Sequence, residues 1–87
     1  MEDKFEVYVA KSIQKDLAKI PKPWQERVIK VIDLLEREPF YGEKMLGKLK
    51  NNYKIRVWPY RIIYKVNKKT KVIEIVEVGH RQGVYKR

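Results

Sequence analysis

The sequence predicts an α+β protein in which a two-helix hairpin packs on one face of a twisted, mostly antiparallel four-stranded sheet. Two observations predict it: apolar stripes with helical spacing lie between residues 11 and 38, and the flanking segments alternate with a period of two. The expected order of elements is β-α-α-β-β-β, because a helical hairpin must lay its stripes on a flat apolar surface. The 87 residues are expected to form a single domain, 1–87, with a small core.

The N-terminal part of the chain predicts a strand and then a short helix. Phe5, Val7 and Val9 alternate with polar residues, so residues 5–9 are expected to form the first strand. Ser12 can accept a hydrogen bond from a nearby backbone amide and cap the helix that follows. The apolar stripe of that helix is Ile13, Leu17 and Ile20.

A second helix is expected after the connector that starts at Pro21. Pro23 suits the first turn of a helix, and the helix is expected to run to about Glu38, before Pro39. Its apolar stripe is Trp24, Val28, Val31 and Leu35, with Ile32 beside it.

Residues 53–66 predict a β-hairpin with Pro59 and Tyr60 at the centre of its turn. In that register Lys54 lies opposite Lys65, the apolar residues share one face and most cations share the other. A slip of one residue would destroy this sorting. Pro59 does not suit the mirror-image turns that join two-residue hairpins, so a bulge or a longer loop is expected. The other predicted pairs are Val57 with Ile62, Ile55 with Tyr64, Tyr53 with Val66, Arg56 with Ile63, and Trp58 with Arg61.

The last predicted strand, Val72 to Val78, is almost continuously apolar and is therefore expected to be central in the sheet. Its facing stays open at this point. The set Val72, Val76 and Val78 competes with Ile73 and Ile75 for the face that meets the helices. Glu74 or Glu77 can then reach across to a cation.

The stretch from Lys44 to Lys71 contains ten Lys or Arg residues and no Asp or Glu. The whole chain has a net charge of +10 and a pI near 9.9, which points to nucleic acid, an anionic membrane surface or an acidic protein as partner. Like charges opposite one another destabilise a sheet. The sheet face without helices is therefore expected to meet an anion.

Several other classes of site are not expected. Without cysteine there is no disulfide, thiol chemistry or zinc–thiolate site, and the single His and scattered glycines provide no metal cluster or phosphate loop. No metal and no cofactor is predicted. No apolar run approaches the roughly 20 residues that span a bilayer, and the N-terminus does not resemble a signal peptide, so a cytoplasmic protein is expected.

The cationic face can support RNA binding or RNA cleavage. In cleavage, the ribose 2′-OH attacks the neighbouring phosphorus, and cations stabilise the charge that develops. Crowded cations can lower the pKa of Lys54 enough for it to act as a base, with Arg56 and Arg61 as a charge clamp. His80 is either the acid or a structural imidazole. The residues expected to bind RNA are Lys48, Lys50, Trp58, Lys65 and His80, while Arg81 and Tyr85 lie at the rim.

An ordered set of short segments resembles the RelE/ParE superfamily of type II toxins, and most closely its RelE branch. These segments are Lys15-Asp16-Leu17, Ile20-Pro21, Gly47-Lys48-Leu49, Tyr53 to Val57, Tyr60 to Tyr64, Val78 to Arg81, and Val84-Tyr85.

The resemblance implies the fold above and a metal-independent mRNA interferase that cuts mRNA in the ribosomal A site through the 2′-OH. It implies catalysis by Lys54 as base, Arg56, Arg61 as clamp, Arg81 as clamp or acid, and Tyr85 orienting the base. It further implies an acidic RelB-like antitoxin and contacts with ribosomal 16S rRNA, the toxin being a monomer or part of a complex with its antitoxin. Two alternatives remain: a ParE-like toxin that acts on DNA gyrase, and a non-catalytic module that binds RNA or antitoxin.

Overall fold

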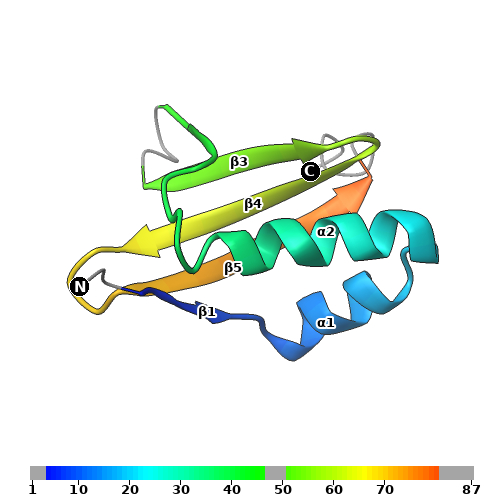
Figure 1. Cartoon of the computed structure of the whole chain (residues 1–87), viewed down its shortest axis with the longest axis horizontal. Coiled ribbons are helices and arrows are strands. Elements are labelled where there is room, and N and C mark those ends of the chain that lie inside the picture. The colour runs from blue at the N-terminus through cyan, green and yellow to red at the C-terminus, as the bar shows by residue number, and fades with distance from the viewer. Residues whose placement is uncertain (1–3, 47–50, 81–87) are drawn as a thin grey trace.

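The computed structural model describes residues 4–46 and 51–80, and it confirms the predicted α+β class, with two helices on one side of a sheet (Figure 1). The sheet has five strands rather than four, because a two-residue strand adds to the edge of the hairpin. The elements are β1 (Glu6–Tyr8), α1 (Lys11–Ala18), α2 (Lys22–Leu34), β2 (Glu43–Lys44), β3 (Asn52–Val57), β4 (Tyr60–Asn67) and β5 (Val72–His80).

The strand order across the sheet is β1-β5-β4-β3-β2. All neighbouring strands are antiparallel except β1, which runs parallel to β5 and places Val7 beside Ile73. β5 therefore lies inside the sheet, as its apolar sequence predicted. The half-burial of Val7 against the core also confirms the face predicted for the first strand.

Helix α1 begins at Lys11, two residues earlier than a cap at Ser12 would allow. Ala10 is the N-cap, in an extended conformation, so Ser12 lies within the helix and the predicted Ser12 cap is wrong. The side-chain amide of Gln14 donates a hydrogen bond of 2.9 Å to the carbonyl oxygen of Val9 and ties the end of the first strand to the start of the helix. A polar contact from inside the helix thus links the two elements.

Helix α2 starts at Lys22, with Pro23 in its first turn as predicted, and ends at Leu34 rather than near Glu38. The N–H groups of the first helical turn have no acceptor within the helix, so the missing N–H of proline costs no hydrogen bond there. The stripes of the two helices meet the sheet as expected. Ile13, Ile20, Val28, Ile32 and Leu35 are buried, while Leu17, Trp24 and Val31 are half-buried against them.

The hairpin of β3 and β4 pairs two residues away from the predicted register. Its turn consists of Trp58 and Pro59, joined by a cis peptide bond, and Val57 lies opposite Tyr60 instead of Ile62. A displacement of two residues leaves every side chain on its predicted face. The apolar pattern therefore predicted the faces correctly but could not distinguish between the two registers.

A bulge in β5 explains why its facing could not be read from alternation. The ladder with β4 shifts between Ile63 and Tyr64, which leaves Val76 as an extra residue on β5. Ile73, Ile75 and Val78 are consequently all buried, although an unbroken alternation would put Val78 on the other face. Each of the two competing apolar sets was thus right for part of the strand.

A hydrogen bond to a buried tyrosine fixes the segment that leads from α2 to β2. The Tyr64 side chain is fully buried, and its hydroxyl oxygen accepts a hydrogen bond of 2.8 Å from the backbone N–H of Gly42. A Cβ atom at Gly42 would lie 2.8 Å from the carbonyl oxygen of Lys54 and 2.9 Å from that hydroxyl, so only glycine fits without a shift. This close approach sets β2 beside β3.

Burial raises the pKa of Tyr64 above its usual value, and the hydrogen bond from Gly42 offsets part of that rise. The Tyr64 ring stacks on Tyr53, with ring centres 5.4 Å apart and an interplanar angle of 17°. Tyr53 in turn packs against Phe40, at 5.7 Å between ring centres. An aromatic column therefore fills the part of the sheet face that lies under the α2–β2 segment.

Candidate nucleic-acid interface

Alternation along β3 and β4 sorts the candidate site residues onto the side of the sheet turned away from the helices, which we call the outer face. Ile55 and Ile62 are buried against the helices, so their neighbours in sequence point the other way. Lys54 and Arg56 of β3 and Arg61 and Lys65 of β4 all lie on the outer face. The structure therefore brings these four predicted residues onto one surface.

Two arginines lie directly opposite each other at the turn end of the hairpin. Arg56 is paired with Arg61 across β3 and β4, and on its other side Arg61 is paired with Gly79 of β5. Arg56 is exposed, whereas Arg61 is only 9% exposed. Opposed strand positions thus carry two arginines, whose guanidinium groups are the donors that bind phosphate and carboxylate oxygens.

The predicted apposition of two lysines is wrong, because the register is displaced. Lys54 lies opposite Ile63 on β4 and opposite Glu43 on β2. No cation faces Lys54 on either ladder. The role of Lys54 as a base stays a prediction, but the cation that was to sit across from it is absent from both partner positions.

Acidic residues of neighbouring strands also lie on the outer face. Glu74 of β5 lies opposite Lys65, and Glu77 lies opposite Ile63. The acid-free stretch of sequence thus becomes a surface flanked by carboxylates from β2 and β5. Period-two alternation alone could not place both β5 glutamates on the outer face, because the bulge at Val76 changes the alternation between them.

Trp58 and His80 lie at the same end of the sheet in different settings. Trp58 is in the hairpin turn and its side chain is 65% exposed. His80 lies opposite Tyr60, and the two rings meet edge to face with centres 5.6 Å apart. Since Tyr60 packs against the core, the register places His80 on the side of the helices, away from the opposed arginines.

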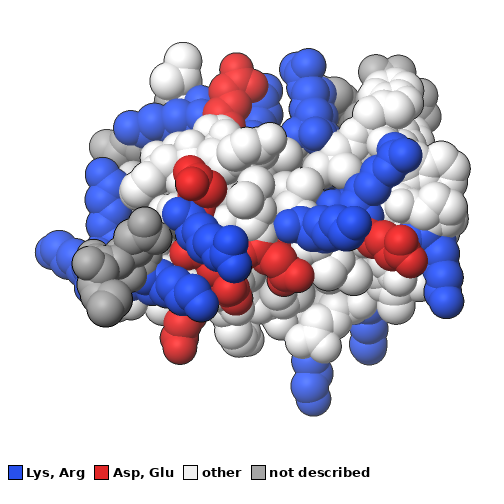
Figure 2. All heavy atoms as spheres, in the orientation of Figure 1, with Lys and Arg blue, Asp and Glu red and all other residues white. Residues whose placement is uncertain are grey.

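Four of the predicted residues, Lys48, Lys50, Arg81 and Tyr85, lie outside the described residues. Their roles stay predictions. Seen from the side of the helices, Lys and Arg are interspersed with Asp and Glu (Figure 2). The positive charge of the chain is therefore not confined to the outer face.

Within residues 4–46 and 51–80, no three His, Asp or Glu side chains gather as a group that could hold a metal ion. In the same ranges, neither helix is long and apolar enough to cross a membrane.

Two helices on a five-stranded sheet, with opposed arginines on its outer face, define a class of small basic α+β proteins. Comparison with known proteins gives the family. The profile of the family described as "ParE toxin of type II toxin-antitoxin system, parDE" matches residues 7–85. The toxin RelE1 of Methanocaldococcus jannaschii is 30% identical over 87 residues, covering 95% of this chain and 97% of that protein.

Comparison with solved structures agrees with this family assignment. A chain of the archaeal RelE–RelB complex from Pyrococcus horikoshii has a TM-score of 0.75 and 33% identity, covering 90% of this chain and 96% of that one. A chain of the RelBE2 toxin–antitoxin complex from Mycobacterium tuberculosis has a TM-score of 0.79 and 25% identity, covering 90% and 99%. The protein belongs to the ParE toxin family of type II toxin–antitoxin systems, in the RelE-like branch of the RelE/ParE superfamily.

Proposed function

We propose that this toxin is a ribosome-dependent endoribonuclease that cuts mRNA in the A site by metal-independent attack of the 2′-OH on the adjacent phosphorus. The opposed arginines, Arg56 and Arg61, are the single observation that carries this proposal. A phosphorane gains negative charge as the 2′-oxygen attacks. Two arginines carried at opposed strand positions can bring their guanidinium groups to that charge from neighbouring strands, which supports the proposal.

The remaining roles follow from position on the sheet. Lys54 lies two residues from Arg56 on the same strand and face, about 7 Å along β3. This spacing supports a role for its amine at the 2′-OH of a ribose whose phosphate is bound by the arginines. Lys54 is the proposed base. Arg81, as clamp or acid, and Tyr85, orienting the base, complete the set proposed from the family resemblance.

The proposed partners are an acidic antitoxin and the ribosome with its mRNA. The structure from Pyrococcus horikoshii is a RelE–RelB complex, and the structure from Mycobacterium tuberculosis is the RelBE2 toxin–antitoxin complex. A chain with a net charge of +10 favours acidic protein and RNA partners alike. Lys48, Lys50, Trp58, Lys65 and His80 are proposed to contact RNA, including 16S rRNA.

The second candidate is a ParE-like toxin that acts on DNA gyrase, and the description of the matching family names a ParE toxin. In the family resemblance, the gyrase-directed branch lacks the residues that cut RNA. This chain has basic residues at Lys54, Arg56 and Arg61, which favours the nuclease.

Mapping of mRNA ends after induction of the toxin tests the proposal. The nuclease should produce cuts inside A-site codons, and Arg61→Ala should abolish both the cuts and the growth arrest. Arg27→Ala, which removes an exposed arginine of α2, is the matched control and should stay fully toxic. DNA breaks at gyrase sites without mRNA cuts would instead support the second candidate.

A further inference from the structure

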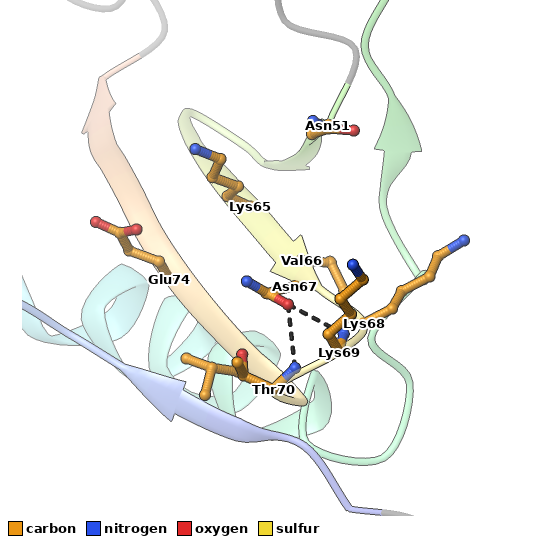
Figure 3. A pocket seen from close by; sticks show the side chains of 9 residues that line it. Asn51, Lys65, Val66, Asn67, Lys68, Lys69, Thr70 and Glu74 are labelled. Atoms are coloured by element: carbon orange, nitrogen blue, oxygen red, sulfur yellow. Dashed lines mark hydrogen bonds between the residues drawn. The ribbon is translucent and has the colours of Figure 1, made fainter.

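A hollow of about 670 Å³ lies at the other end of β4 from the opposed arginines, beside the turn that joins β4 to β5 (Figure 3). Three ammonium groups and one carboxylate line it, together with neutral hydrogen-bonding side chains. Its lining comprises Asn51, Lys65, Val66, Asn67, Lys68, Lys69, Thr70, Val72 and Glu74. The lining therefore has a net positive charge and several N–H and O–H donors, which is the chemistry that an anion requires.

The turn beside the hollow is fixed by a side chain. The Oδ1 atom of Asn67 accepts hydrogen bonds from the backbone N–H groups of Lys69, at 3.0 Å, and Thr70, at 3.1 Å. With its oxygen held by these two donors, the Asn67 amide nitrogen must point the other way, and Figure 3 shows it directed into the hollow. The donor group is thus oriented before any ligand arrives.

The lysines of the hollow differ in what they can offer. The Lys68 ammonium lies 5.5 Å from the centre of the Phe40 ring and so serves partly as a cation–π contact. Lys65 and Lys69 are exposed, and Lys65 extends from β4 on the same face as Arg61. Glu74 lies opposite Lys65 on the ladder and opposes the binding of an anion there.

The position of the hollow indicates which anion it takes. Four residues along one strand separate Arg61 from Lys65, or about 14 Å. Both side chains lie on the outer face, so a polynucleotide backbone that crosses the opposed arginines can continue along β4 to the hollow. We infer that the hollow binds a backbone phosphate of RNA, held by Lys65 and Lys69 with the Asn67 amide. This inference rests on the proposed function for the identity of the RNA, although the binding itself requires no cleavage.

Binding of oligonucleotides that cannot be cut tests the inference. The probes are 2′-O-methyl RNAs of about three and about nine nucleotides and vacant ribosomes, with affinity measured over a range of salt concentrations. The double variant Lys65→Gln/Lys69→Gln should weaken binding of the longer oligonucleotide about three- to tenfold. It should also reduce the salt slope of that binding by about 0.7 for each phosphate that is no longer neutralised. The shorter probe should be unaffected if it occupies only the arginines.

Glu74→Gln should act in the opposite direction and tighten binding, because it removes the carboxylate that faces Lys65. The control Lys15→Gln/Lys30→Gln removes two exposed helix lysines and should have a much smaller effect. A loss confined to the longer probe identifies a phosphate of the bound strand, and a loss confined to ribosome binding identifies a phosphate of rRNA. Either result supports the hollow as a phosphate site.

The inference is overturned if the Lys65/Lys69 variant binds both oligonucleotides and ribosomes like the control. It is also overturned if that variant loses only binding to an acidic antitoxin. The probes cannot be cut, so their binding does not depend on cleavage. Failure of the protein to cleave mRNA would therefore refute the proposed function and leave the test of phosphate binding in the hollow unaffected. Circular dichroism melts of all variants should coincide, because the substituted side chains are exposed.

Discussion

Removal of the Tyr64 hydroxyl tests how the α2–β2 segment is held on the sheet. In Tyr64→Phe the backbone N–H of Gly42 loses its 2.8 Å acceptor at a partly buried position. An unpaired donor of this kind costs about 1–3 kcal/mol. The stacking on Tyr53 is kept, because the ring itself is unchanged. At about 4–8 °C per kcal/mol for a chain of this size, we expect a fall in Tm of roughly 5–20 °C.

Urea unfolding followed by fluorescence, with thermal melts beside it, measures this loss. Tyr41→Phe is the matched control, since that side chain is 59% exposed and one residue from Gly42. The free energy of unfolding should fall for Tyr64→Phe and stay within about 0.5 kcal/mol of the original for Tyr41→Phe. Equal stability of the two variants would refute the idea that this hydrogen bond holds the segment in place.

Three further predictions concern pH, the β5 bulge and salt. The folded-state pKa of Tyr64 is raised above its value of about 10 in the unfolded chain, so the stability that the neutral hydroxyl contributes is present below pH 10 and lost at higher pH. In alkaline denaturation above pH 10, Tyr64→Phe should therefore lose less stability than the original protein. Deletion of Val76 removes the bulge and keeps the buried β5 residues on one face, so circular dichroism should show a folded protein. Deletion of Ile63 should prevent folding, because it turns the side chains of half of β4 to the opposite face. Neutralisation by an acidic antitoxin should weaken as salt rises in a growth-rescue or binding assay, and a salt-independent affinity would argue against contact with the basic surface.

The faces of the strands and helices could be predicted from sequence because burial imposes a period. Val28 on α2, Leu35 at its C-cap, and Ile55 and Ile62 on the hairpin are buried as their spacing indicated. The pairing of Arg56 with Arg61 could not be predicted, since a displacement of two residues preserves every face and only the turn decides between the registers.

The acidic neighbours of the site could not be placed from the sequence for a different reason. Glu43, Glu74 and Glu77 lie on strands outside the hairpin, and the stretch from Lys44 to Lys71 gives no information about what flanks it in the sheet. Lys54 and Arg61 were correctly expected to share a face. The composition of a stretch thus predicted the cations of the surface but not the charges that adjoin them.

The parallel pairing of β1 with β5 has a consequence for folding during synthesis of the chain. Glu6 emerges early from the ribosome but lies beside Val72, which is made near the end of synthesis. A contact between such distant positions closes a large loop and forms slowly. The sheet therefore cannot be completed before β5 has been synthesised, so β1 must wait for its partner until translation is nearly finished.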